Sequence, residues 1–475
     1  MFNERKKQRG WRLATLLFIA VVGFLSNNSF AQGSGKKILL REILFDGNIK
    51  TDNEYLLRLL PYHKGDTLLL NEVILDINIC KDRLLNSGLF IDVKSGLENL
   101  DTIQVTFHFS LTERFYTLII PVVDVYDRNF NSWFVTHKHD FNRVEYGLTF
   151  SQNNINGKGN LLRAYALFGF SQRFAIGYTI PFFDKKQHWG LNSLVSYSRN
   201  KNITYNSDSN REQILFVPKE FLRRNFKSQL DLVYKPKIHC EQTFSFSYNA
   251  ILIEDTLRKR NNFYLADSLL HENYFSIAYS FSYDTRNIEN YPTYGSLIQF
   301  SMAKNGLGKF DNLNLWSASA QLEKYFSLGN KFYFNTKAKA KYISQSYLNY
   351  ANQIGLGYHR DYVSGYEYYV ADGNAFALWK NEFKYNLFTY HIKVFKTAFV
   401  KSSSIPFEFY PKIYFDCGYV MNAQNQISNT LTNYFLRGFG AGFDIVSLYD
   451  TSVSFEYSVN HLGESGLYLH FNSFF

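Results

Sequence analysis

The sequence predicts a mainly β protein: a 16-stranded antiparallel transmembrane β-barrel preceded by one small α+β domain. Three observations lead to this fold class. Aromatic residues make up 18% of the 475 residues, and such side chains suit the pleated surface of a sheet. From residue 115 to 475, apolar and polar residues alternate with the two-residue period of β-strands. Short connections between these strands alternate with long ones, as in transmembrane barrels.

The first 31 residues predict a secretory signal peptide. Basic residues crowd the start, an apolar run follows over residues 13–25, and Ser29-Phe30-Ala31 resembles a cleavage site, so we expect the chain to leave the cytoplasm. The formal net charge of +10 falls once this basic leader is removed. The mixed charges that remain do not predict a nucleic-acid partner.

Residues 36–113 predict a small domain with the order β-α-α-β-β. The first strand ends at Asp46-Gly47-Asn48, and two helical stretches follow, of which the second ends at Gly88. Two further strands with alternating apolar residues complete the domain.

The remaining chain, residues 115–475, predicts the barrel. After the leader, no stretch approaches the ~20 apolar residues of a membrane helix, and a closed barrel is how strands cross a bilayer without unpaired backbone groups. A large secreted sandwich or propeller, which also alternates, is the competing fold. We place strand starts near residues 116, 143, 160, 173, 189, 227, 242, 274, 295, 314, 331, 375, 407, 434, 450 and 465.

The last strand ends on an aromatic residue. Its predicted lipid-facing side chains are Leu467, Leu469, Phe471 and Phe475. In a closed barrel the last strand pairs with the first, so we expect the chain to end inside the wall with an aromatic side chain at the membrane interface.

Two motifs in residues 36–113 resemble a POTRA domain: I-x-F-x-G-N over residues 43–48, and LLNSGLFIDV over residues 84–93. The barrel resembles that of the BamA/TamA superfamily of outer-membrane assembly proteins, also known as the bacterial surface antigen family. The chain is similar to a short form of this family with a single POTRA domain, and the resemblance covers nearly all of the chain after the leader.

Four barrel stretches carry this resemblance. Residues 283–296 match a D-x-R…P-x-x-G turn, residues 414–420 match an F-D-x-G-Y-V strand, and residues 436–444 and 456–471 look like the closing strands. The matching motif residues are Asp284, Arg286, Pro292, Gly295, Asp416 and Gly418.

A long loop contains a variant of the family's V-R-G-[FY] motif. The resemblance implies that this loop tucks into the lumen, where the family's arginine pairs with inner-wall groups that include the F-D-x-G aspartate. Here Val363, Ser364, Gly365 and Tyr366 form the motif, so Ser364 stands at the arginine position. Arg360 and Arg286 are the candidates to supply a guanidinium to Asp416 instead.

The alternation assigns the motif residues to the inner face of the barrel. Aromatic neighbours face lipid, which places Asp284, Arg286, Asp416 and Gly418 inside, where a carboxylate is least costly. Their simplest role is to form ion pairs with a lysine row, residues 337–341.

Three glycines of one strand share the same inner face. Gly438, Gly440 and Gly442 alternate with lipid-facing Phe439, Ala441 and Phe443. We expect a groove over these glycines that receives the folded-in loop, with Tyr366 as its occupant. The alternative is that the glycines only permit strand bending.

The sequence does not predict an enzyme, a cofactor or a metal site. His137, His139 and Asp140 lie close together in one loop without further ligand residues, and no nucleophile motif accompanies the scattered serines and histidines. The cysteines, Cys80, Cys240 and Cys417, are odd in number and widely spaced. We interpret them as small buried or membrane-facing residues.

The resemblance implies a factor that inserts or translocates proteins at the outer membrane. The implied partners are the lipid bilayer and unfolded outer-membrane or secreted client proteins, with periplasmic or lipoprotein accessory factors as further candidates. Two other classes stay open: a passive or substrate-specific channel, to which the inner lysine row would give anion preference, and a scaffolding barrel for a surface complex.

Overall fold

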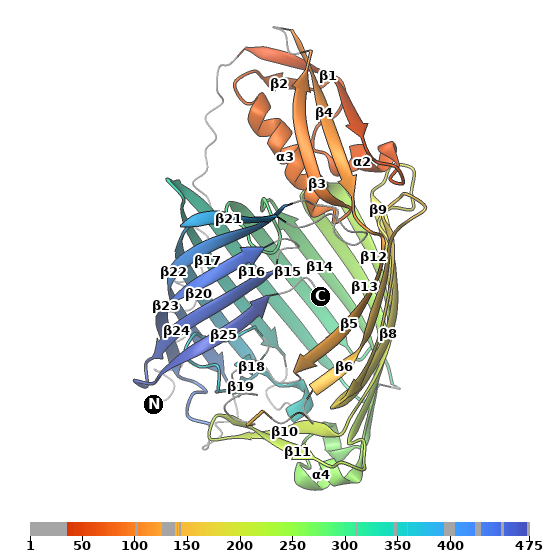
Figure 1. Cartoon of the computed structure of the whole chain (residues 1–475). Coiled ribbons are helices and arrows are strands. Elements are labelled where there is room, and N and C mark those ends of the chain that lie inside the picture. The colour runs from red at the N-terminus through yellow and green to blue at the C-terminus, as the bar shows by residue number, and fades with distance from the viewer. Residues whose placement is uncertain are drawn as a thin grey trace.

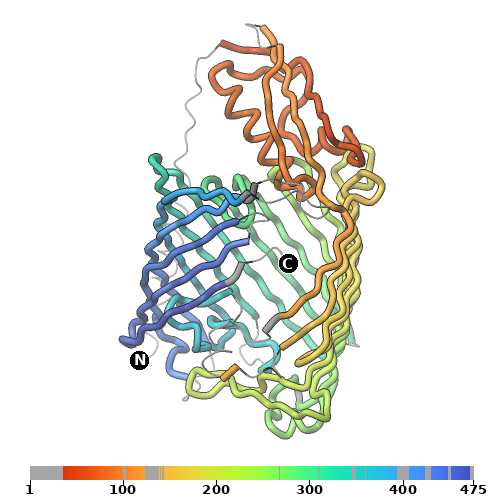
Figure 2. The backbone as a smooth tube through the Cα atoms, viewed as in Figure 1, coloured from red at the N-terminus to blue at the C-terminus, as the bar shows by residue number. Residues whose placement is uncertain are grey.

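The computed structural model describes residues 36–99, 103–125, 138–139, 141, 144–309, 311–344, 349–358, 360–393, 404–422, 429–447 and 451–472. The predicted signal peptide, residues 1–31, lies outside this part of the chain. Within the described residues, no helix is both long and apolar enough to cross a membrane. Figures 1 and 2 show the small domain seated on one end of the large curved sheet.

The small domain has a four-stranded sheet in the order β2-β1-β4-β3, in which β1 and β4 are parallel. Its elements are β1 (Lys37–Asp46), α2 (Asn53–Leu59), β2 (Thr67–Leu69), α3 (Val73–Asn86), β3 (Phe90–Glu98) and β4 (Gln104–Glu113). The predicted order β-α-α-β-β omitted β2. This strand has only three residues, which are too few to show a two-residue period.

The core of this domain lies between the helices and one face of the sheet. Phe107 and Phe109 of β4, Leu56 of α2 and Leu84 of α3 are fully buried there. The alternation of buried and exposed residues along β4 is that of a strand with one covered face.

The large sheet contains seventeen antiparallel strand segments. They are β5 (Thr117–Val125), β6 (Val144–Ile155), β7 (Asn160–Gly169), β8 (Ser171–Ile180), β9 (Trp189–Asn200), β12 (Arg223–Lys237), β13 (Cys240–Ile253), β14 (His271–Asp284), β15 (Gly295–Asn305), β16 (Leu315–Gly329), β17 (Phe332–Ile343), β20 (Ala375–Tyr385), β21 (Phe388–Lys393), β22 (Ser404–Met421), β23 (Phe435–Ser447), β24 (Ser452–Asn460) and β25 (Ser465–Asn472).

Two of these segments are parts of one strand. Both β20 and β21 pair with β22, and the register shifts by a single residue between Lys384↔Lys412 and Phe388↔Phe409. The wall therefore has sixteen crossings, the predicted number, and each begins within four residues of its predicted start.

The strand order runs around one barrel, with β9 next to β12 and β25 next to β5. Residue pairing is described for the other neighbouring strands, including β9 with β12, but not for β25 with β5. The pairing of the last strand with the first therefore stays a prediction.

The predicted lipid face carries apolar side chains that are exposed on the outside of the barrel. Phe415, Phe439 and Leu467 have exposed fractions of 43, 56 and 76%.

Further elements gather at the barrel end that lies opposite the small domain (Figure 1). They are β10 (Asn202–Asp208), β11 (Arg211–Phe216), α4 (Asp255–Arg260), the 3-10 helices η3 (Ala266–Ser268) and η4 (Tyr350–Asn352), β18 (Ile354–Leu356) and β19 (Ala371–Gly373). Leu222, Leu257 and Leu265 are fully buried in a separate apolar cluster among these elements.

Candidate functional site

The connection between β17 and β20 folds into the barrel and is buried against its inner wall. Val363 and Tyr366 have exposed fractions of 0 and 2% and belong to one apolar cluster. The wall contributes Phe376 and Leu378 of β20 and Val420 of β22 to this cluster. The loop is thus held partly by the burial of apolar surface, which is the main favourable term in packing.

Hydrogen bonds to one buried carboxylate fix the centre of the loop. The hydroxyl Oγ of Ser364 donates to Oδ2 of Asp416 at 2.5 Å, and the backbone N–H of Ser364 donates to the same oxygen at 3.2 Å. Asp416 is 2% exposed, and Nζ of Lys380 lies 3.4 Å from the same Oδ2 atom. Lys380 and Asp416 are directly opposite one another on β20 and β22.

The predicted arginine partners of Asp416 were wrong. Arg286 pairs with Asp284 at 2.7 Å and with Glu323 at 3.5 Å, and the described contacts of Asp416 do not include Arg360. A lysine of the wall therefore supplies the positive charge beside Asp416. Nζ of Lys380 also lies 4.1 Å from the ring centroid of Tyr362, which ties the same lysine to the loop.

The inner-face glycines leave room for this loop at two positions. A Cβ atom on Gly438 would lie 1.8 Å from the carbonyl oxygen of Ser364, and a Cβ atom on Gly418 would lie 2.6 Å from Cδ1 of Leu356. Real Cβ atoms essentially never approach within 3.0 Å of another heavy atom, so the loop and side chains at these positions cannot coexist unchanged.

The groove is occupied differently from the prediction. The main chain of Ser364 lies over Gly438, while the hydroxyl group of Tyr366 contacts Nδ1 of His461. Side chains of the wall fill the rest, because Cβ atoms on Gly440 and Gly442 would meet the Tyr414 hydroxyl at 2.4 Å and Cε of Lys412 at 3.1 Å. Gly365 contributes backbone freedom, since its φ of +86° lies in the left-handed region.

The other predicted site residues do not all join this loop. Asp284 and Arg286 lie at the barrel end next to the small domain, where Arg83 and Asn86 contact Asp284 and Asn287. Leu467 faces outward. Leu469 is partly buried, whereas the side chain of Phe471 and all of Phe475 lie outside the described part of the chain. The considered metal ligands His137 and Asp140 also lie outside it, and only His139 is described.

The small domain docks onto the turns of the barrel through its two helices. The guanidinium group of Arg58 in α2 donates to the carbonyl oxygens of Gln187 and Lys235, at 2.9 and 3.0 Å. Asn86 of α3 donates to the carbonyl oxygen of Asn287 at 2.6 Å. The sequence contains no motif for these contacts, because they depend on the relative placement of the two domains.

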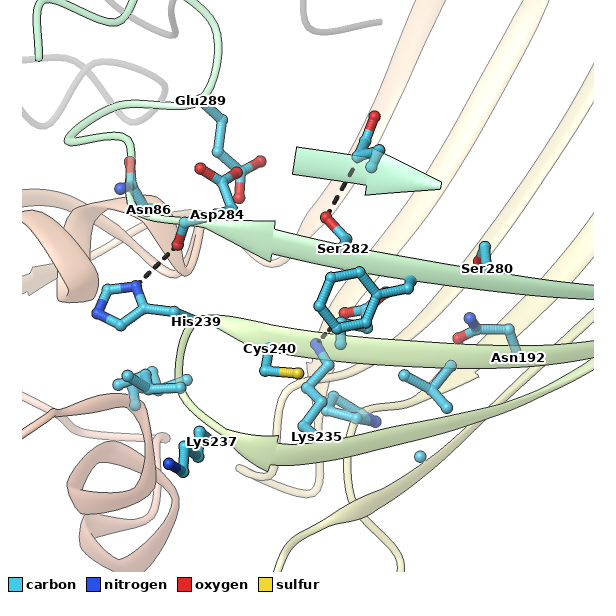
Figure 3. Close-up of a pocket in the computed structure, with 18 of the residues that line it drawn as sticks. Asn86, Asn192, Lys235, Lys237, His239, Cys240, Ser280, Ser282, Asp284 and Glu289 are labelled. Carbon is cyan, nitrogen blue, oxygen red and sulfur yellow. Dashed lines mark hydrogen bonds and ion pairs between the residues drawn. The ribbon is translucent and has the colours of Figure 1, made fainter. Parts of the chain in front are cut away.

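A second contact involves a histidine in a turn of the barrel. Nδ1 of His239 lies 2.7 Å from the carbonyl oxygen of Asp284 (Figure 3). A guanidinium nitrogen of Arg83 contacts the same Nδ1 atom and lies 3.3 Å from Nε2. A neutral ring has one nitrogen that can accept a hydrogen bond from Arg83, whereas a protonated ring has none. Burial and the charge of Arg83 lower the pKa of His239 below its usual 6.5, which favours this neutral form.

Between the docked helices and the inner wall lies a cavity of about 970 Å³. Its lining includes Arg58 and Arg83 of the helices. Lys235 and Cys240 of the wall and Glu289 also line it (Figure 3). The lining is mixed in charge. All three cysteines are free thiols: Cys80 and Cys417 are buried, and burial raises the pKa of Cys80.

Comparisons with known proteins identify both parts of the chain. The family model described as the Omp85 superfamily domain matches residues 154–453, and the POTRA model, described as surface antigen variable number repeat, matches residues 38–114. The chain belongs to the Omp85 superfamily. It is therefore an outer-membrane barrel protein with one POTRA region. Its class of function is insertion into, or translocation across, the outer membrane.

Comparison with solved structures shows that BamA shares this fold. BamA from Haemophilus ducreyi lacking POTRA domains 1–3 is 16% identical, with 91% of this chain and 83% of that chain covered and a TM-score of 0.53. CdiB from Escherichia coli is 13% identical, with 94% and 92% covered and a TM-score of 0.48. The similarity to BamA concerns the fold alone. No curated protein matches the chain.

Proposed function

We propose that this Omp85 protein captures unfolded client chains on an edge of its POTRA sheet and passes them to its barrel for insertion into, or transfer across, the outer membrane. The observation that carries the proposal is the position of β3. In the described sheet, β3 pairs with β4 alone, so its other edge is available for an added strand.

The edge strand lies beside the joint that leads into the barrel. Phe90, the first residue of β3, pairs with Glu113 at the end of β4, and β5 begins at Thr117. A client strand added to β3 would therefore be held close to the first barrel strand. The proposed next step is templating of the client at the seam between β5 and β25, which are neighbours in the strand order.

The joint between the two domains is fixed by buried hydrogen bonds. Glu113 accepts from the backbone N–H and the hydroxyl group of Thr51, at 2.9 and 2.6 Å, and the Tyr116 hydroxyl lies 3.0 Å from that of Thr51. The side-chain amide of Asn154, near the end of β6, donates to the Thr51 hydroxyl at 2.8 Å. This network supports a set distance between the capture edge and the barrel.

The charges of the lumen argue against the alternative of an anion channel. Lys337 and Lys339 of the inner row pair with Glu323 and Asp361, at 2.9 and 2.7 Å. Their charges are therefore largely compensated rather than offered to passing anions.

A hairpin also covers the barrel end away from the POTRA domain. Asn210, at the tip of the β10–β11 hairpin, accepts at its carbonyl oxygen from the backbone N–H of Val370 and at its side-chain oxygen from that of Leu431. These bonds join the hairpin to the connection between β17 and β20, called the lumen loop below, and to the segment before β23. A steady open pore would require them to separate.

Depletion of the protein followed by quantitative outer-membrane proteomics tests the proposal. Loss of a defined set of barrel or surface proteins is expected, whereas an unchanged proteome with altered solute uptake would favour the channel. Capture is tested with a photo-crosslinking residue at Lys94 of β3. A matched position at Leu75 on α3, 56% exposed, should not capture nascent barrels.

A further inference from the structure

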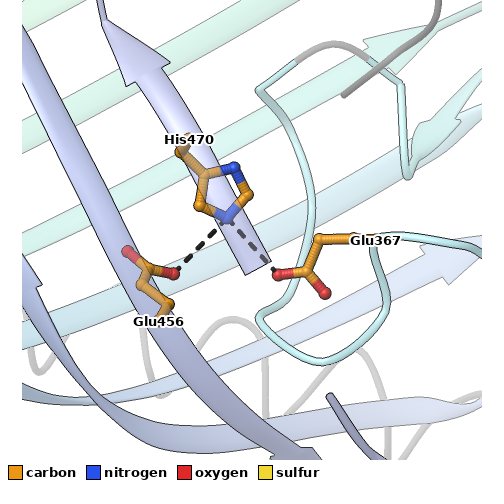
Figure 4. A group of neighbouring side chains, drawn as sticks. All are labelled: Glu367, Glu456 and His470. Carbon is orange, nitrogen blue, oxygen red and sulfur yellow. Dashed lines mark ion pairs between the residues drawn. The ribbon is translucent and has the colours of Figure 1, made fainter. Parts of the chain in front are cut away.

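Three side chains from three separate segments converge inside the barrel (Figure 4). Glu367 belongs to the lumen loop, Glu456 to β24 and His470 to β25. Their nearest oxygen and nitrogen atoms all lie within 4.8 Å of one another, and the side chains are 0, 10 and 14% exposed. This cluster is distinct from the Ser364–Asp416 anchor.

The geometry does not fit a simple hydrogen-bonded histidine. Both carboxylates face the same ring nitrogen: Nε2 of His470 lies 3.8 Å from Oε1 of Glu367 and 3.5 Å from Oε2 of Glu456. These distances exceed the ~2.7–3.2 Å of an N–H···O hydrogen bond, and one N–H cannot point at two acceptors equally well. Zinc bonds of about 2.1 Å in a tetrahedral site place ligand atoms roughly 3.4 Å apart, which is close to this spacing.

Another histidine of the chain shows the contrasting arrangement. His108 in the POTRA sheet also lies between two carboxylates, but each uses a different ring nitrogen: Nε2 lies 2.6 Å from Asp46 and Nδ1 lies 3.1 Å from Glu98. Because these contacts use opposite nitrogens of the ring, they leave no common point between three ligand atoms. The lumen cluster has such a point.

The balance of charge around the cluster gives a second, independent observation. A continuous chain of ion pairs links four carboxylates through two lysines and His470. Its members, in order, are Glu382, Lys384, Asp444, Lys412, Glu456, His470 and Glu367. The two lysines leave two negative charges in this chain. Lys380 also lies near Glu456, Glu382 and Glu367, but together with its partner Asp416 it adds no net charge. A protonated His470 would compensate one of the two negative charges. Uncompensated charge in a buried site is costly, whereas a divalent cation beside a neutral imidazole would balance both.

The histidine ring is also held in place for such a role. It stacks on Tyr362, with ring centroids 5.3 Å apart and planes 23° from parallel, and the Tyr362 hydroxyl lies 3.3 Å from each of the two ring nitrogens. Outer contacts of this kind orient the imidazole ligands of metal ions.

We propose that Glu367, Glu456 and His470 bind a divalent transition-metal ion inside the barrel. Two carboxylates and one imidazole are a ligand set for ions such as Zn²⁺, Mn²⁺ or Fe²⁺, while Mg²⁺ and Ca²⁺ favour oxygen ligands alone. The bound ion would clamp the lumen loop to the last two strands of the barrel.

Metal content of the purified full-length protein tests the proposal. The protein is stripped with a chelator in detergent, dialysed against Zn²⁺, and analysed by elemental mass spectrometry, with melting followed by intrinsic fluorescence. We expect one Zn²⁺ per chain and a higher melting temperature with Zn²⁺. His470→Gln and Glu367→Gln should each bind none and lose the thermal shift.

Two control variants make the result specific. Glu382→Gln removes a charge from the same chain of ion pairs without removing a ligand, and His108→Gln removes the POTRA histidine, so both should keep one Zn²⁺. Zinc that survives in folded His470→Gln, or disappears in His108→Gln, would overturn the assignment. If the wild-type protein binds no zinc, that result alone would overturn the assignment, with no need to test the variants. None of these outcomes bears on client insertion, which is measured separately.

Discussion

Replacement of Gly438 by alanine should expel the lumen loop from its seat. The new Cβ atom would lie 1.8 Å from the Ser364 carbonyl oxygen, more than an ångström inside the 3.0 Å limit, and the obstructing atom belongs to the backbone. No side-chain rotation can relieve this contact. The loop must move, and its hydrogen bonds to Asp416 at 2.5 and 3.2 Å must break.

The size of the effect follows from those two bonds. A hydrogen bond to a charged group contributes about 1.5–3 kcal/mol, so their loss costs roughly 3–6 kcal/mol. Because about 1.4 kcal/mol is a factor of ten in an equilibrium, the released loop should gain at least about 100-fold in population. The ion pair between Lys380 and Asp416 should remain, so the lost stability should concern the loop and not the barrel wall.

Limited trypsin digestion in detergent measures the release. Arg360 lies within the loop and should be cut much faster in Gly438→Ala than in the wild type, with a lower melting temperature. Gly177→Ala in β8 is the matched control, because its Cβ atom would come no closer than 3.2 Å to a neighbour. Equal protection of the loop in Gly438→Ala and Gly177→Ala would refute the reasoning.

Four further outcomes follow from the structure. Phe107→Ala should lower the free energy of unfolding of the POTRA domain by about 3–5 kcal/mol, measured by hydrogen exchange, because its ring is fully buried. Arg58→Ala removes two hydrogen bonds and should weaken docking by roughly 1–3 kcal/mol, seen as a broader distance distribution between spin labels on the two domains. Docking should also weaken when the pH is lowered from about 8 to about 5. The docked form depresses the pKa of His239 below 6.5, so its contribution is present above that value and is lost as the pH falls through the depressed pKa; His239→Gln should remove this dependence. Asn210→Ala should increase flickering conductance in planar bilayers, and unchanged conductance would mean that the hairpin does not limit the pore.

The sixteen wall crossings could be predicted because each alternates over eight or more residues, and membrane strands must keep this period along their length. The three residues of β2 are too few for a period, so that strand was missed. The split of one crossing into β20 and β21 comes from a one-residue register shift, which has no residue signature here.

The candidate site could be predicted only in part. The motif around Ser364 and the inner glycines located the loop and the wall, but not the partner of Asp416. Lys380 is far away in the sequence and reaches Asp416 only through the register of β20 on β22. The docking residues Arg58 and His239 depend on how two separately folded domains meet, and local patterns contain no information on that.

The joint between the POTRA sheet and the barrel has a consequence for how far a client can travel. Only residues 114–116 separate β4 from β5, and three extended residues span at most about 10 Å. Because Thr51 and Glu113 hydrogen-bond at this short connection, we expect the POTRA sheet to stay at a fixed distance from the barrel and not to swing about the connection. Under the proposed function, a captured segment would therefore cross from the POTRA edge to the barrel in one short step, which would favour compact hairpins over long extended stretches.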